Sequence, residues 1–145
     1  MIHENTFKKV EFDGAKGFVF LGEKILVYRR DTNTTIFPLS IDLPGGGREG
    51  CESPFETFQR ETKEEFGIEI KEADIVFCDI VQNIINPNKI SYAFITHSLK
   101  FTEKDIVFGD EGTEWMLLTP KEFIERKDGI KGQQDWAREF LQQIR

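Results

Sequence analysis

Residues 43–70 read LPGGGREGCESPFETFQRETKEEFGIEI, and this stretch decides the fold. A glycine-rich loop comes first, and a helix is predicted to follow over Pro54–Phe66. Ser53 is a favoured N-cap residue, proline suits the first helical position, and Glu56 lies where a capping box needs an acidic side chain. Gly67 provides the left-handed residue with which many helices end. The stretch therefore predicts a loop and a well-capped helix.

One face of the predicted helix is apolar. Phe55, Phe58, Thr62 and Phe66 recur at intervals of three or four residues. This spacing brings them onto a single stripe of an α-helix. We expect the stripe to face a hydrophobic core.

Another face carries Glu61, Glu64 and Glu65, which are spaced so that their side chains converge. Like charges at this spacing repel by roughly 0.2–0.5 kcal/mol per pair, and the C-terminal turns of a helix disfavour anions. A bound divalent cation would turn these repulsions into attractions, because magnesium takes carboxylate oxygens together with waters and substrate phosphates. A metal site is one explanation of the three glutamates, and a solvated acidic face is the other.

The residues around these glutamates complete a longer pattern. A glycine, a glutamate, an Arg-Glu pair, a Glu-Glu pair and a Gly-Ile end occupy Gly46, Glu52, Arg60-Glu61, Glu64-Glu65 and Gly67-Ile68. This pattern resembles the Nudix box, the signature of the MutT-like Nudix hydrolases, at every charged and glycine position. Thr62 stands where the family usually has an aliphatic residue. Because Thr62 lies on the predicted core face, this departure concerns packing more than chemistry.

The resemblance assigns roles to these residues. It implies a site for Mg²⁺ or Mn²⁺ whose ligands are the Gly46 carbonyl, Glu61, Glu64 and Glu65. Glu64 is either a further ligand or the group that activates water. Arg60 presents a planar fork of donors that suits a carboxylate, so its pairing with Glu52 is expected to orient the loop and the glutamates.

The implied reaction follows from the same chemistry. Cleavage of a phosphoanhydride requires a positioned water and neutralisation of the charge that develops on oxygen, and metal ions supply both. The resemblance implies hydrolysis of a nucleoside diphosphate linked to another group, such as a nucleoside triphosphate or ADP-ribose. No marker in the sequence specifies which compound is the substrate. The alternative is a Nudix-fold sensor that binds a nucleotide without hydrolysing it, although such modules commonly lose the glutamates that this chain keeps.

Two short apolar runs, Ala15–Phe20 and Lys24–Tyr28, predict a β-hairpin before the box. Arg29 and Arg30 follow the second run, and the resemblance supports a contact with the substrate anion, with Arg30 preferred. The alternative is a pair of surface arginines that balances the charge of an acidic surface. In the loop that follows, Phe37 is expected either to wall the substrate pocket or simply to pack.

A second informative stretch is FGDEGTE at residues 108–114. Many Nudix hydrolases bring a further glutamate from a loop just before a late strand, where it holds metal or activates water. Glu111 and Glu114 both fit this place, and the sequence does not choose between them. The alternative is an ordinary polar turn before the strand that TEWMLL predicts.

The remaining segments predict further strands and helices. Ile75–Ile85 and Lys89–Leu99 flank the turn Asn86-Pro87-Asn88 and predict two strands. Pro120–Arg126 predicts a short helix, and Gln134–Ile144 predicts a closing amphipathic helix. This order predicts an α/β (α+β) protein. The resemblance sharpens the prediction to the Nudix fold, a mixed β-sheet between helices in an α/β/α sandwich.

The length suits a single domain over residues 1–145. The formal net charge of −7 argues against a binder of nucleic acid polymers, but a metal can bridge an acidic protein and a nucleotide. No apolar run is long enough to span a membrane and the N-terminus has no signal-peptide core, so a cytoplasmic protein is expected. Cys51, beside the expected site, is more readily a bystander than a nucleophile. The resemblance also allows a homodimer, although no segment specifies an interface.

Overall fold

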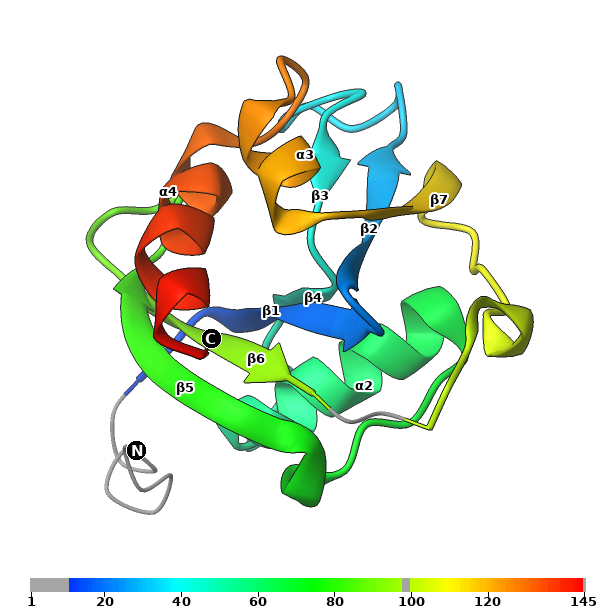
Figure 1. Cartoon of the computed structure of the whole chain (residues 1–145). Coiled ribbons are helices and arrows are strands. Elements are labelled where there is room, and N and C mark those ends of the chain that lie inside the picture. Colours follow the sequence, from blue (N-terminus) through cyan, green and yellow to red (C-terminus); the bar gives the residue numbers. More distant parts are fainter. Residues whose placement is uncertain (1–10, 98–99, 145) are drawn as a thin grey trace.

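The computed structural model describes residues 11–97 and 100–144. Its strands are β1 (Gly14–Leu21), β2 (Lys24–Arg30), β3 (Ile41–Asp42), β4 (Gly45–Gly47), β5 (Ile75–Gln82), β6 (Ile90–Thr96) and β7 (Gly112–Leu118). Its α-helices are α2 (Pro54–Phe66), α3 (Pro120–Glu125) and α4 (Lys131–Phe140) (Figure 1). Short 3₁₀ turns occupy Glu72–Asp74, Glu103–Asp105 and Leu141–Ile144.

The described strands form a mixed sheet in the order β3-β2-β1-β6-β5, with β4 paired to β1 and β7 paired to β2. The pairing of β1 with β6 is parallel, and the other pairings are antiparallel. β1 therefore joins two parts of the sheet: residues 14–19 pair with β6, and Phe20 and Leu21 pair with the start of β2.

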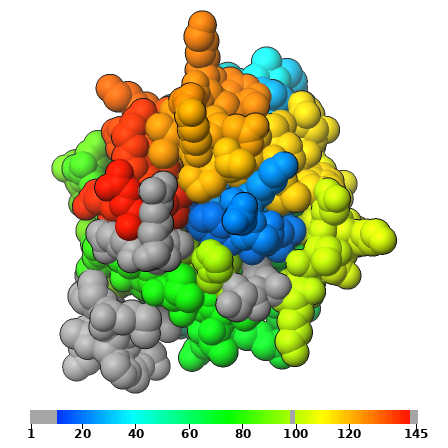
Figure 2. All heavy atoms as spheres, viewed as in Figure 1, coloured from blue at the N-terminus to red at the C-terminus, as the bar shows by residue number. Residues whose placement is uncertain are grey.

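Hydrophobic side chains fill both faces of the sheet. Neighbouring residues of a strand point to opposite faces, so Phe18 and Phe20 join the core beneath α3 and α4, whereas Val19 joins the core beneath α2 (Figure 1). On the face shown in Figure 2, the C-terminal helices (orange to red) lie directly beside the β1–β2 segment (blue). The predicted fold class, a mixed sheet between helices, is confirmed.

The helix α2 has the predicted bounds and the predicted caps. Ser53 Oγ accepts the Glu56 N–H at 3.2 Å, and Glu56 Oε1 accepts the Ser53 N–H at 2.9 Å, which completes a capping box. Gly67 is left-handed with a φ of 71° and donates its N–H to the Lys63 carbonyl at 2.9 Å. The predicted stripe of three phenylalanines and a threonine is buried.

The sequence does not predict β3 and β4. They have two and three residues, too few for an alternating pattern, and β4 consists only of glycine. Its strand character comes from pairing with residues 14–16 of β1. At Gly45, where φ is 129°, a Cβ would collide with the backbone of β1 at Ala15. Glycine is therefore required for the loop to lie this close to β1.

Several predicted ends differ from the observed ones. The run Ile75–Ile85 leaves the sheet at Gln82, because Asn83 Oδ1 accepts the N–H groups of Ile85 and Asn86 at 3.0 and 2.8 Å and forms a turn. β6 covers the middle of the run Lys89–Leu99, whose residues 98–99 lie outside the described part of the chain.

The two C-terminal helices are present at the predicted places. α3 ends at Glu125, one residue before the predicted end, and α4 begins at Lys131, three residues before the predicted start. Of the helices that the structure describes, none is both long and apolar enough to cross a membrane.

Candidate active site

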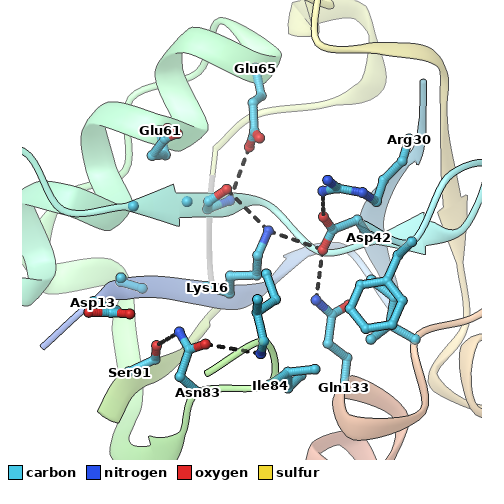
Figure 3. Close-up of a pocket in the computed structure, with 18 of the residues that line it drawn as sticks. Asp13, Lys16, Arg30, Asp42, Glu61, Glu65, Asn83, Ile84, Ser91 and Gln133 are labelled. Atoms are coloured by element: carbon cyan, nitrogen blue, oxygen red, sulfur yellow. Dashed lines mark hydrogen bonds and ion pairs between the residues drawn. The ribbon is translucent and has the colours of Figure 1, made fainter. Parts of the chain in front are cut away.

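A pocket of about 510 Å³ opens where β1, β4, α2 and the start of α4 meet (Figure 3). Carboxylates line one part of it, two cationic side chains line another, and apolar side chains complete the walls. The residues used below are Lys16, Arg30, Phe37, Asp42, Gly46, Glu61, Glu65, Glu111, Gln133 and Trp136. The pocket thus joins elements from both halves of the chain.

Three carboxylates gather in this pocket. Glu61 and Glu65 come from successive turns of α2, and Glu111 comes from the loop before β7. One oxygen from each lies within 4.8 Å of the others. The loop reaches this place because Val107 and Gly109 donate their N–H groups to the Phe66 and Glu65 carbonyls at 3.0 and 2.8 Å. These bonds attach the loop to the C-terminal turn of the helix.

Glu65 is the most unusual of the three. The residue is 2% exposed, and its Oε1 accepts a hydrogen bond from the Gly45 N–H at 3.0 Å. Oε2 is buried and has no hydrogen-bond partner within residues 11–97 and 100–144. Burial raises the pKa of Glu65 well above its usual value, against the opposing charge of Lys16. A buried carboxylate oxygen without a donor needs a cation or a proton.

Glu61 lies against the glycine loop. A Cβ on Gly46 would collide with the Glu61 carboxylate, so only glycine allows this approach. Burial, and then the nearby Glu111 charge, raise the pKa of Glu61. Hard divalent cations prefer clusters of carboxylate and carbonyl oxygens. The donor set at this place therefore fits Mg²⁺ or Mn²⁺.

Arg60 joins the loop to the helix. Its Nε lies 2.7 Å from Glu52 Oε2, its Nη2 donates to the Gly47 carbonyl at 2.8 Å, and its Nη1 lies 3.4 Å from Glu61 Oε2. The hydrogen bond from Arg60 lowers the pKa of Glu52 below its usual value. Glu52 and Arg60 lie where an orienting pair would have to lie.

Glu64 and Glu114 lie apart from the cluster. The Glu64 side chain is 51% exposed and lies 3.3 Å from Arg60, outside the pocket lining. Glu114 forms an ion pair with Arg29 at 2.9 Å, and Arg29 also contacts Asp128 at 3.1 Å. Of the two late glutamates, Glu111 is thus the one beside the α2 carboxylates.

The two arginines of β2 point to different places. Arg29 lies outside the pocket, whereas Arg30 lines it. Arg30 Nε donates to the Ile36 carbonyl at 2.9 Å, and Nη1 lies 2.8 Å from Asp42 Oδ2. It therefore holds the loop that carries Phe37, whose ring lines the pocket from a left-handed backbone position with φ of 48°.

Lys16, Asp42 and Gln133 are pocket residues that the sequence analysis did not identify. Lys16, Arg30 and Gln133 converge on the Asp42 carboxylate, which is 1% exposed (Figure 3). Burial would raise the pKa of Asp42, but Lys16, Gln133 and Arg30 hold it below its usual value. One signal was available: Asp42 is a charged residue between two apolar ones, directly before the glycine loop.

Known proteins resemble this chain in sequence family and in fold. The model of the NUDIX domain family matches residues 12–142. Among solved structures, a MutT protein from Methanosarcina mazei Go1 superposes with a TM-score of 0.74 at 20% identity, over 93% of this chain and 98% of that one. An Ap4A hydrolase from C. elegans superposes with a TM-score of 0.69 at 16% identity, over 90% and 97%.

A bifunctional NMN adenylyltransferase/ADP ribose pyrophosphatase from Francisella tularensis has a TM-score of 0.62 at 16% identity, over 86% of this chain and 40% of that one. No protein of curated function matches the chain significantly in sequence. At these identities the solved structures show the fold alone, and the family model shows the family. The chain therefore belongs to the NUDIX domain family.

Proposed function

We propose that this member of the NUDIX domain family is a hydrolase that uses a divalent metal, Mg²⁺ or Mn²⁺, to cleave the phosphoanhydride of a nucleoside diphosphate linked to another group. The observation that carries the proposal is the buried, unpartnered Oε2 of Glu65 beside the oxygens of Glu61 and Glu111. An acidic cluster alone is common on protein surfaces. A buried carboxylate with one oxygen left without a donor is not, because that oxygen destabilises the fold unless a cation or a proton binds it.

Four groups would hold the metal: the carboxylates of Glu61, Glu65 and Glu111 and the carbonyl of Gly46. When bound, the metal neutralises charge on the substrate oxygens and lowers the pKa of a coordinated water. Glu64 remains a predicted ligand or water-activating group, but its side chain is exposed and lies beside Arg60. Glu111 has the stronger support, because its carboxylate lies in the cluster with Glu61 and Glu65. Glu114 also remains a candidate, but it is less well supported because its carboxylate forms an ion pair with Arg29.

The protein groups around this point have separate tasks in the proposal. Arg60, paired with Glu52, keeps Glu61 and the glycine loop in a fixed orientation. Arg30 has N–H groups on a pocket wall across from the carboxylates, where they suit a phosphate oxygen. Phe37 and Trp136 offer aromatic surface for a nucleobase. Electrostatic positioning of this kind supplies most of the rate enhancement in phosphoryl transfer.

The substrate class is supported by the chemistry of the pocket and by similar folds whose described activities concern Ap4A and ADP ribose. We expect a small nucleotide derivative as substrate. A cytoplasmic location and a homodimer, both expected from the sequence, remain proposals to be tested by fractionation and by light scattering.

The test is release of phosphate or pyrophosphate from a panel of nucleoside triphosphates and diphosphate-linked compounds, with Mg²⁺ and with EDTA. Glu111→Gln and Glu114→Gln form a matched pair, because the two residues are three positions apart and only Glu111 lines the pocket. We expect turnover to depend on metal, to be lost in Glu65→Gln and Glu111→Gln, and to persist in Glu114→Gln.

The proposal fails if turnover is equal with Mg²⁺ and with EDTA, or if Glu65→Gln is fully active. A protein that binds a nucleotide but hydrolyses no compound of the panel would instead be a sensor. Glu64→Gln belongs in the same series, since strong loss of turnover in that variant would restore Glu64 to the predicted role.

A further inference from the structure

A buried chain of polar groups connects α4 with the glycine loop of the site. Gln133, near the start of α4, accepts the Leu43 N–H at 3.2 Å through Oε1 and donates from Nε2 to Asp42 Oδ1 at 2.7 Å. One side chain therefore holds the backbone of one residue and the carboxylate of the residue before it. All three residues are at most 2% exposed.

Lys16 extends this chain toward the carboxylate cluster. Its ammonium group lies 3.0 Å from Asp42 Oδ1 and donates to the carbonyls of Leu43 and Gly45, each at 3.2 Å (Figure 3). Gly45 in turn donates its N–H to Glu65 Oε1 at 3.0 Å. Contacts thus run without a break from α4, through Asp42 and Lys16, to Glu65.

We propose that Gln133 and Asp42 are positioning residues, which fix residues 42–47 so that the Gly46 carbonyl and the Glu65 carboxylate converge on the metal. The inference rests on the proposed metal-dependent hydrolysis. Both residues act through the backbone of the glycine loop. The C-terminal helix is accordingly part of the active-site support, although it carries no residue of the Nudix box.

The physical reason lies in the burial of the partners. Without the Gln133 amide, the Leu43 N–H would remain buried and unsatisfied, and Asp42 Oδ1 would keep only its contact with Lys16. Such groups are strongly unfavourable, so the loop is expected to shift until they find other partners. A shift of the loop would move Gly46 relative to Glu65. Replacing a residue that orients metal ligands typically reduces metal affinity or activity by about 10- to 100-fold.

The neighbouring residue offers a matched control. Gln134 is in the same helix, is 7% exposed, and donates its Nε2 to the carbonyls of Phe123 and Arg126 at 3.0 and 2.8 Å. It too is a buried glutamine with two hydrogen bonds, but its partners lie around α3, away from the pocket. Gln133→Met and Gln134→Met therefore remove comparable contacts from the two sides of one helix.

The experiment measures Mn²⁺ binding to the full chain by electron paramagnetic resonance, without substrate, in the wild type and both variants. Thermal midpoints and kcat and KM at saturating Mn²⁺ are measured on the same samples. We expect both variants to melt at lower temperature, whereas only Gln133→Met weakens Mn²⁺ binding, by about 10-fold or more. We expect its kcat to fall more than its KM changes, because Arg30, Phe37 and Trp136, which are proposed to contact the substrate, are kept.

Equal Mn²⁺ binding and equal kcat in the two variants would overturn this inference and leave the proposed function intact. Absence of Mn²⁺ binding by the wild type would instead overturn the proposed function, and the inference with it. If Gln133→Met does not fold, Gln133→Asn takes its place. It keeps an amide but is one carbon too short to reach both Leu43 and Asp42, and the same criteria apply.

Discussion

Glu65 and Gly45 share a hydrogen bond of 3.0 Å from the backbone N–H to Oε1, and this bond satisfies only half of the carboxylate. The other oxygen is buried and has no donor in the described part of the chain. A buried polar group in this state destabilises a protein by about 1–3 kcal/mol, and a charged one by more. Glu65 therefore destabilises the metal-free fold. In the proposed function, a bound cation removes this destabilisation.

The first prediction concerns Glu65→Gln. The neutral amide keeps the acceptor for Gly45 but does not bury a charge. We therefore expect the free energy of unfolding of the metal-free variant to exceed that of the wild type by at least about 1 kcal/mol. Turnover should be nearly abolished in the same variant. Urea titration with EDTA and a turnover assay with Mg²⁺ measure the two effects. A variant that is both less stable and fully active would contradict the role assigned to this residue.

The second prediction is a pH dependence. Burial raises the folded-state pKa of Glu65 well above its ordinary value of 4.5. The stability that the proton on Glu65 provides is therefore fully present below about pH 4.5 and is lost as the pH rises through the higher folded-state pKa. Without metal, the wild type should lose stability relative to Glu65→Gln as the pH rises from about 4.5 toward the folded-state pKa of Glu65. The Glu61 charge is one of the causes that raise the pKa of Glu65, so the difference also contains the coupling between the two carboxylates.

Urea unfolding in EDTA at several pH values checks this sign. Adding Mg²⁺ at neutral pH should remove the difference, because the cation takes the place of the proton. Parallel stability profiles for the two proteins would show that Glu65 does not titrate in this range.

The third prediction concerns Arg60. Lysine keeps the charge but cannot reach Glu52, the Gly47 carbonyl and Glu61 together. We expect Arg60→Lys to lower kcat by about 10- to 100-fold with a smaller effect on the thermal midpoint. Arg138→Lys is the matched control, because Arg138 is an exposed residue paired with Asp135 at 2.8 Å. Comparable kcat values for the two variants would remove Arg60 from the site.

The fourth prediction concerns Thr62, the departure from the Nudix box. Its side chain is fully buried in α2, and its Oγ1 has no hydrogen-bond partner among the described residues. Valine has the same shape without the hydroxyl, so Thr62→Val should raise the free energy of unfolding by about 1 kcal/mol and leave turnover unchanged.

Thr57→Val is the matched control for this change. Thr57 is equally buried in the same helix, but its hydroxyl donates to Glu52 Oε1 at 3.1 Å. We expect this variant to be less stable than the wild type. Denaturant titration of both variants tests the pair, and a loss of stability in Thr62→Val would show that its hydroxyl has a partner after all.

The sequence could predict those elements whose structure is determined by residues close together in the chain. α2 is an example, because its capping box, phenylalanine stripe and terminal glycine all lie within one short stretch. The choice between Glu111 and Glu114 is a counterexample. It depends on two hydrogen bonds between a distant loop and the end of α2, and on the pairing that places Glu114 opposite Arg29. No local pattern contains that information.

The Asp42 network was missed for the same reason. Lys16 and Gln133 are more than a hundred positions apart. Lys16 stands in a segment whose pattern is explained by its own strand, and Gln133 lies one position before the predicted closing helix. Only the folded chain brings them to one carboxylate. Arg30 was predicted to face the substrate, and the sequence could not indicate that two of its donors also hold the loop of residues 34–36.

The attachment of the Glu111 loop to α2 has a consequence for how this domain tolerates variation. Because Val107 and Gly109 are bonded to the helix itself, the spacing of the acidic side chains is independent of the length of the exposed segment that precedes them. Extra residues inserted after Lys104 should therefore enlarge the surface and leave turnover unchanged, which an insertion series would measure. The position of Glu111 beside Glu61 and Glu65 is in this respect set locally, whereas the glycine loop depends on contacts that reach it from α4.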